Sequence, residues 1–201
     1  MARKCKCGCK VELPPAAKCT DIISKKGYSS IKCLADHEKA KRELKAEKEV
    51  KQRNKEFREK VAINKKATTP RSKWLSRLQT LINQWVVNVR DKDEPCCTCG
   101  TTKPTIKYDA GHMISRGSSP ELRFELTNIH KQCSMKCNVY GSGKRKEYEL
   151  FIIEKYGQAH LDWLNGPHKL LKEQYPDNES IEKDMIFYRR LLRDAGLRPN
   201  E

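Results

Sequence analysis

Two pairs of cysteines carry the clearest chemical signature in the sequence. Cys96 and Cys99 lie in the segment PCCTCG, and Cys133 and Cys137 follow in NIHKQCSMKCN. Four thiolates in two pairs bind zinc in a closed tetrahedral site, which stabilises a fold and leaves no open position for a substrate. The spacing therefore predicts a structural zinc site, in which Cys97 is an alternative to Cys96.

A second group of cysteines lies near the N-terminus, and its members are Cys5, Cys7, Cys9, Cys19 and Cys33. Cys33 and His37 form a Cx₃H pair, which two of the three earliest cysteines would complete to a second zinc site. The alternative is a flexible arm whose thiols bind no metal.

The composition and charge limit the class of protein. The N-terminus has no apolar segment like that of a signal peptide, and no run approaches the roughly 18 apolar residues of a membrane span. We therefore expect a reducing cytoplasm, where ten cysteines point to metal ligands before disulfides. The net charge is +16, with +11 in residues 1–70, +6 in 71–150 and −1 in 151–201. This excess predicts a polyanionic partner, and nucleic acid is favoured over membrane because no apolar anchor accompanies it.

The elements that position these residues can be read from hydrophobic spacing. Residues 71–90 have large apolar residues at steps of three and four, namely Trp74, Leu78, Leu81, Trp85 and Val89, which predicts a core helix after an N-cap at Thr69. Residues 35–66 contain neither Gly nor Pro and no broad apolar stripe. They are interpreted as a solvated helix or basic linker, with a coiled coil or a DNA-tracking helix as alternatives.

The rest of the chain alternates short extended pieces with helices. A strand is expected near Ile106 and Tyr108, and another extended piece near Leu122 and Phe124. Helices are expected at 144–157, 158–164, 167–175 and 180–196. The sequence therefore predicts an α+β fold with a zinc-binding arm (1–38), a charged helical linker (39–69), a core (70–150) and a helical C-terminal region (151–201).

The segments YDAGHMIS and LRFELTNIHKQCSMKCN resemble the zinc-stabilised ββα-metal core of HNH nucleases. They place His112, Asn128 and Asn138 in the order and approximate spacing of that motif. The resemblance implies that His112 is the general base, that Asn128 orients it, and that Asn138 binds the catalytic cation. Asn138 in place of a final histidine is similar to the HNN variant of the junction-resolving endonuclease of T-even phages.

The resemblance also implies a second ligand for the catalytic Mg²⁺ or Mn²⁺. The common HNH pattern has an acidic residue directly before the histidine, whereas Gly111 occupies that position here and Asp109 lies three residues before His112. Positions 109 and 112 of a regular strand face opposite sides. We therefore expect a bulge at Ala110 and Gly111 that brings Asp109 to the cation.

Read together with PRSKWLSRLQTLINQWV and PCCTCGTT, these segments resemble the phage NinG (Rap) recombination endonuclease family over residues 70 to about 150, with a weaker match at the N-terminus. The family implies a metal-dependent endonuclease that cleaves branched recombination intermediates, such as Holliday junctions and D-loops, in the cytoplasm of the host cell. It implies DNA as the partner, with a homodimer and phage recombination proteins as further candidates. It also favours Cys9 as a ligand that joins Cys33 and His37, and we take Cys5 as the fourth.

Basic residues near the motif, Arg116, Lys144 and Arg145, are candidates for contacts with DNA. The main alternative to a nuclease is a non-catalytic zinc-binding module that binds DNA and recruits recombination proteins. That module would share the cysteines and the charge but would leave the placement of His112, Asn128 and Asn138 unexplained. An HNH nuclease that acts on RNA differs from the first interpretation only in its substrate.

Overall fold

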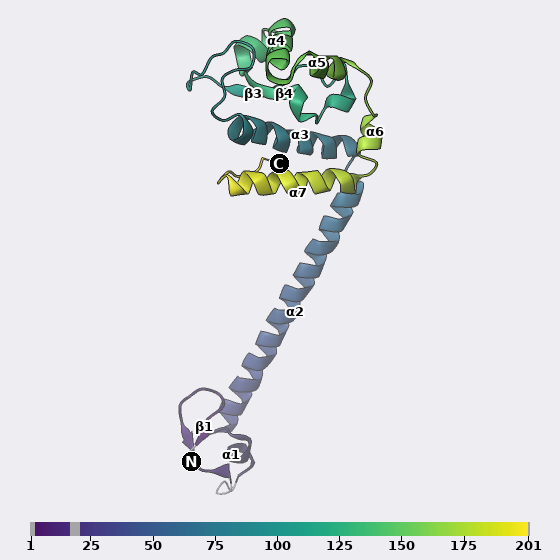
Figure 1. Cartoon of the computed structure of the whole chain (residues 1–201). Helices are drawn as coiled ribbons and strands as arrows, with labels where there is room; N and C mark the ends of the chain where they lie inside the picture. The colour runs from purple at the N-terminus through teal and green to yellow at the C-terminus, as the bar shows by residue number, and fades with distance from the viewer. Residues whose placement is uncertain (1–2, 17–20, 201) are drawn as a thin grey trace. The chain divides into compact units, whose positions relative to one another are not determined.

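The computed structural model describes residues 3–16 and 21–200, and Cys19 lies outside these ranges. The chain divides into two compact units, Met1–Thr68 (unit 1) and Thr69–Glu201 (unit 2). Helices predominate, and each of the two small sheets has two strands, which confirms the α+β class (Figure 1). In the described part of the chain, no helix has the length and apolar character needed to span a membrane.

Unit 1 begins with a short antiparallel pair of strands, β1 (Arg3–Lys4) and β2 (Glu12–Leu13). The short helix α1 (Ile22–Lys26) and the long helix α2 (Ile31–Thr68) follow. A small buried cluster joins these elements around Cys5, Leu13 and Tyr28. The cluster brings the start of α2 next to the strands, and Cys33 packs against it.

The helix α2 has 38 residues, so it is about 57 Å long. No side chain of α2 is buried, and its surface carries ion pairs such as Glu47 with Lys51 at 2.6 Å. The solvated helix expected for residues 35–66 is therefore present. It starts at Ile31, so the predicted arm and linker share one continuous helix.

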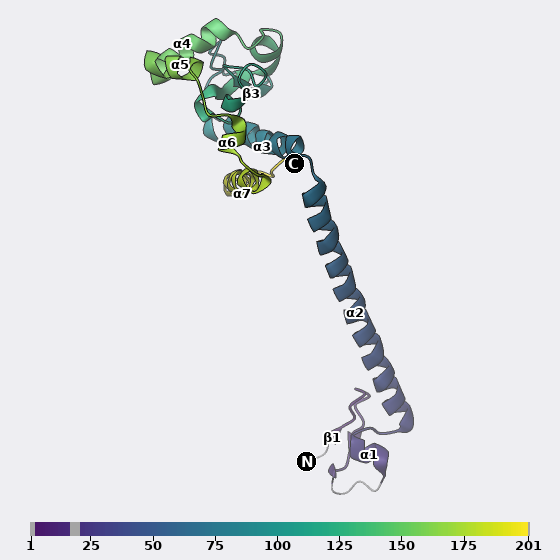
Figure 2. The same cartoon turned by 90° about the vertical axis from the view of Figure 1, so that its right-hand side faces the viewer.

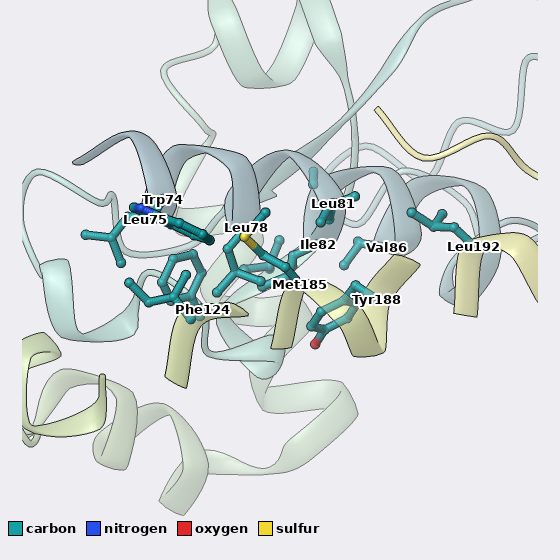
Figure 3. Packing of buried hydrophobic residues seen from close by; sticks show 13 residues of the cluster. Trp74, Leu75, Leu78, Leu81, Ile82, Val86, Phe124, Met185, Tyr188 and Leu192 are labelled. Atoms are coloured by element: carbon teal, nitrogen blue, oxygen red, sulfur yellow. The ribbon is translucent and has the colours of Figure 1, made fainter. Parts of the chain in front are cut away.

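Unit 2 is organised around two helices that pack along each other, α3 (Arg71–Trp85) and α7 (Asn178–Asp194) (Figure 1). The apolar face of α3 lies against α7, and the interface includes the fully buried side chains of Leu78, Leu81 and Leu192 (Figure 3). The spacing of apolar residues in α3 predicts this face. The N-cap is Pro70 and not Thr69, and α3 continues as a π-helical turn, η2 (Val86–Arg90).

The sheet of unit 2 pairs β3 (Tyr108–His112) with β4 (Ile129–Cys133) in antiparallel register. Ala110 and Ile129 pack into the cluster with α3 and α7. The helices α4 (Arg145–Tyr156) and α5 (Gln158–Asn165) lie on the other side of the sheet, so the layers run from α7 through α3 and the sheet to α4 and α5 (Figures 1 and 2).

Two local expectations are wrong. The segment near Leu122 is a 3₁₀ turn, η3 (Pro120–Leu122), because the buried Asn128 holds the Leu122 carbonyl and so favours a compact loop over an extended strand. The helix expected at 167–175 is reduced to α6 (Leu171–Gln174). Its N-cap, Leu170, has an extended backbone that ends the preceding loop.

Candidate functional site

The cysteines of the core come together as their spacing predicts. Cys96, Cys99, Cys133 and Cys137 have all their Sγ atoms within 4.8 Å of one another. The Sγ atom of Cys133 lies 3.8 Å from that of Cys96 and 3.7 Å from that of Cys99. A tetrahedral zinc ion with zinc–sulfur bonds of about 2.3 Å has sulfur–sulfur edges of about 3.8 Å. These four thiols could therefore hold zinc.

The local fold decides which cysteine of the first pair is available. Gly100 has a φ of +67°, and its N–H donates to the Cys96 carbonyl at 2.9 Å, which closes the turn of the first pair. The Cys133 N–H donates to Cys96 Sγ at 3.3 Å. Cys97 instead lies in the hydrophobic cluster with Tyr148, where burial raises the pKa of its thiol. The structure thus brings Cys96, and not Cys97, to the cluster.

The second group of thiols that could hold zinc consists of Cys5, Cys7, Cys9 and Cys33. The structure groups Cys7, and not the predicted His37, with the other three thiols. The His37 Nδ1 lies 2.9 Å from the Tyr28 hydroxyl. The β1–β2 hairpin supplies all three partners of Cys33, which is why the helical Cx₃H pair is not used.

A cavity of about 690 Å³ opens beside β3 in unit 2. Three side chains that the sequence singled out line this one cavity: Asp109, His112 and Asn138. Asp109 and His112 come from β3, and Asn138 comes from the π-helical turn η5 (Ser134–Val139). Because Asn138 directly follows Cys137, the core cysteine cluster fixes the turn that carries the amide into the cavity.

Asp109 and Asn138 are in direct contact. The Asn138 Nδ2 donates to Asp109 Oδ2 at 3.2 Å, and Lys107 Nζ lies 3.5 Å from Asp109 Oδ1. This arrangement leaves the amide oxygen of Asn138 as a further acceptor beside the carboxylate. Carboxylate and amide oxygens are ligands that Mg²⁺ and related hard cations prefer, so this pair fits a divalent cation.

His112 is held in one orientation by a backbone carbonyl. Its Nε2 lies 3.1 Å from the carbonyl oxygen of Arg123, and a carbonyl can only accept, so Nε2 carries the proton. The other nitrogen, Nδ1, is then the unprotonated one. Burial lowers the pKa of His112 to about 4, and the positive charges of Arg116 and Arg123 also lower it. His112 is therefore neutral at pH 7 and able to accept a proton.

Asn128 is not among the residues that line the cavity. It is fully buried, and its Oδ1 accepts from the Ile114 N–H at 2.8 Å. Its Nδ2 donates to the carbonyls of Ile114 at 3.0 Å and Leu122 at 3.2 Å. Asn128 thus ties together the loop that follows His112. It is a positioning residue for that loop, and the structure gives it no hydrogen bond to the His112 side chain among the described residues.

The bulge expected at Ala110 and Gly111 is absent, and the prediction is wrong. The β3–β4 ladder is continuous through these positions. A Cβ added at Gly111 would lie 2.3 Å from the Gln132 Oε1, so the Gln132 side chain would have to move to admit the acidic residue of the common pattern. Asp109 and His112 nevertheless both line the same cavity.

The basic residues proposed for DNA contacts differ in their availability. Arg116 is exposed and lines the cavity. Lys144 lies at the start of α4 and pairs with Glu147 at 3.3 Å. The guanidinium of Arg145 is occupied by Glu149 at 2.5 Å, the Met113 carbonyl at 3.2 Å and the Asn165 amide oxygen at 2.8 Å. Arg145 therefore links α4, α5 and the loop after β3, and its contact with DNA stays a prediction.

A family model described as "Bacteriophage Lambda NinG protein" matches residues 1–195. The chain belongs to the NinG family. It is 35% identical over 137 residues to the Protein ninG of Salmonella phage P22, which covers 68% of this chain and 66% of that protein. It is 34% identical over 136 residues to the Protein ninG of Escherichia phage lambda, which covers 68% of this chain and 64% of that protein.

The Protein ninG of Escherichia phage 933W is 38% identical over 111 residues, or 55% of this chain and 54% of that protein. The match to these curated NinG relatives thus spans between about half and two thirds of their lengths. No solved structure matches the chain.

In this NinG-family chain, the sequence predicted the helix α3 but not that its polar face forms one wall of the cavity. Thr80, Gln84 and Asn88 of α3 and η2 line it. These three residues recur at steps of four, so they form a polar stripe beside the apolar one, which could have indicated that this face of the helix borders a cavity. The buried Gln79 accepts from Arg123 Nε at 3.3 Å and so links α3 to the residue whose carbonyl holds His112. No local pattern indicated this link.

Proposed function

We propose that this NinG-family chain is a metal-dependent DNA endonuclease with an HNH-like core. The observation that carries the proposal is the single cavity lined by Asp109, His112 and Asn138. These side chains come from an antiparallel strand pair and the turn that follows it, and the core cysteine cluster joins the two. The excess of positive charge in residues 1–150 favours a polyanionic substrate.

The residues supply the parts that hydrolysis of a phosphodiester requires. Nδ1 of His112 accepts the proton of the attacking water, and the hydrogen bond from Nε2 to the Arg123 carbonyl keeps that nitrogen in place. Asp109 and Asn138 would hold Mg²⁺ or Mn²⁺ through their oxygens. When bound, such a cation neutralises charge on the phosphate oxygens and stabilises the departing 3′ oxygen. Arg116 at the rim positions a phosphate.

The proposal extends to branched DNA formed in phage recombination, in the cytoplasm of the host cell. This part rests on the resemblance to the recombination endonucleases, since the relatives carry only the name Protein ninG. A homodimer and contacts with other recombination proteins belong to the same extension. The two cysteine clusters act as structural zinc sites in this proposal, because four thiolates leave no open position at the metal.

The test compares wild-type protein with His112→Ala and Asn138→Ala on linear, forked and four-way DNA, with and without Mg²⁺ or Mn²⁺. We expect His112→Ala to lower the cleavage rate by about 10²- to 10⁴-fold, because a general base contributes that much to rate and little to binding. Asn138→Ala should lose cleavage similarly and recover part of it at raised Mn²⁺, because it removes a cation ligand.

The matched control is His168→Ala, since His168 lies outside the cavity and bonds the Leu164 carbonyl at 3.1 Å. This variant should cut at the wild-type rate. Zinc content and DNA affinity should stay constant in all three variants. If His112→Ala cuts as fast as wild type, the role of His112 as general base fails. If wild-type protein cuts no DNA with either cation, the nuclease assignment itself fails. A zinc-binding module that recruits recombination proteins would then replace it.

A further inference from the structure

The segment after α7 is fixed against α3 by one side chain. Gln84 of α3 donates from Nε2 to the Arg198 carbonyl at 2.8 Å, and its Oε1 accepts from the Asn200 N–H at 2.8 Å. Gly196, with a φ of +74°, turns the chain after α7, and the Leu197 N–H donates back to the Leu192 carbonyl at 2.9 Å. The segment 196–200, which we call the tail, therefore has a defined path along α3.

The tail forms part of the wall of the cavity that holds His112. Asn200 lines this cavity, and it also lines a second hollow of about 660 Å³. The other residues around the second hollow are Arg193, Arg198 and Pro199. Asn200 is therefore shared by the two hollows, which lie on either side of this one residue or next to it.

Two arginine side chains at the second hollow are available to bind an anion. Arg193 and Arg198 are exposed, and neither guanidinium has an ion pair or a hydrogen bond among residues 3–16 and 21–200. Arg190, one turn earlier on α7, differs because it pairs with Asp194 at 3.7 Å. Arginine matches phosphate through two parallel N–H donors, so a pair of available guanidinium groups beside a groove fits the backbone of a nucleic acid.

We propose that Arg193 and Arg198 form a second phosphate-binding site, contiguous with the cavity, that holds the DNA backbone away from the scissile phosphate. The site deepens the proposed nuclease function and rests on it. Arg116 and the tail then contact the same DNA from two sides of the cavity. The family match ends at residue 195, so Arg198 lies in a segment outside it.

The test measures binding separately from cleavage. Affinity for a fluorescent duplex and a four-way junction is determined by anisotropy across a range of salt concentrations, with His112→Ala as the background so that no substrate is cut. Each phosphate contact contributes about 0.9 to the slope of log K against log salt, so the double change Arg193→Ala and Arg198→Ala should flatten the slope by about 1.8. Arg190→Ala is the matched control and should leave the slope unchanged.

A second variant tests the fixed path of the tail. Gln84→Ala keeps both arginines but removes the two hydrogen bonds that hold the tail, so its affinity should fall between that of the background protein and that of the double variant. In protein with His112 intact, the double variant should raise KM and leave kcat within about twofold, because the contacts bind the ground state and the transition state equally.

The outcomes separate this site from the nuclease assignment. If wild-type protein cuts DNA while the double variant has the slope of the Arg190→Ala control, the second site is wrong and the nuclease stands. If nothing cuts DNA but the slope still flattens by about 1.8, the phosphate contacts stand without the catalytic role. Inorganic phosphate that displaces DNA at submillimolar concentration would indicate a site for a free anion and would overturn the proposal.

Discussion

Each of the two cysteine clusters contains four thiols, but the surroundings of the two clusters differ. In unit 2, Cys96, Cys133 and Cys137 are buried, whereas in unit 1 only Cys5 is buried and Cys9 is exposed. The cluster of unit 2 also joins β4 to the turn that carries Asn138 into the cavity, and that of unit 1 joins a short hairpin to α2. Equal ligand sets therefore have unequal consequences, since only one cluster shapes the candidate site.

The largest effect is expected from Cys133→Ser in the cluster of unit 2. The change removes a thiolate at the end of β4, so the protein should lose one zinc per chain and the free energy of unfolding of unit 2 should fall by at least about 3 kcal/mol. Cleavage should be lost together with the fold of the turn. Zinc analysis, thermal unfolding and a cleavage assay measure these changes.

The control for this variant is Cys97→Ser, because Cys97 is a neighbouring buried cysteine outside the cluster. It should keep its zinc and cost about 1 kcal/mol through packing alone. Equal zinc loss in both variants would mean that Cys97 is a ligand, and an unchanged stability of Cys133→Ser would contradict the zinc site itself.

A smaller effect on cleavage is expected from pH, which changes the protonation of His112 in the cavity. In the proposed mechanism cleavage requires neutral His112, and burial lowers the pKa of His112 to about 4, so the rate should fall only as pH falls through about 4. A histidine with an ordinary pKa of about 6.5 would lose roughly tenfold between pH 7 and pH 5.5. The expected loss at pH 5.5 is less than about twofold.

The measurement is kcat/KM from pH 5 to pH 8 in protein whose zinc content is checked at each pH. A constant zinc content separates the titration of His112 from acid release of the metal. An acid limb with its midpoint near 6.5 would show that the environment of His112 differs from the one described.

A similarly small effect on cleavage is expected from the cluster of unit 1. Cys7→Ser should lose one zinc per chain but change kcat by less than about threefold and the stability of unit 2 by less than about 0.5 kcal/mol, because the two sites are independent. His37→Ala should keep both zinc ions, since the imidazole contacts Tyr28 and not the thiols. If His37→Ala loses zinc and Cys7→Ser keeps it, then His37, and not Cys7, is the zinc ligand beside Cys33.

The same contrast explains what the sequence could predict. The core cluster follows from two well-separated pairs, and the chain between Cys99 and Cys133 contains the hairpin that brings them together. At the N-terminus three cysteines alternate with other residues, so spacing alone cannot decide how many of them face Cys33. That choice depends on the path of the β1–β2 hairpin and on Tyr28, whose hydroxyl contacts the His37 ring.

Within the candidate site, local motifs located Asp109, His112 and Asn138 but not the contacts that hold them. Gly111 packs against the side chain of Gln132 on the neighbouring strand, which a Cβ at this position would meet. The wall formed by Asn200 depends on the packing of α7 along α3 and on the two hydrogen bonds of Gln84. These contacts join segments far apart in the sequence, and periodicity reports only which face of one helix is buried.

The helix α2 has a thermodynamic consequence for the whole chain. It has no buried side chain, and each hydrophobic cluster of the described residues lies entirely within one unit. Cooperativity of unfolding arises from a shared core, so the two units are separate cooperative blocks connected by a helix of local stability. A single two-state transition therefore does not describe this protein, and one melting temperature would average two different equilibria.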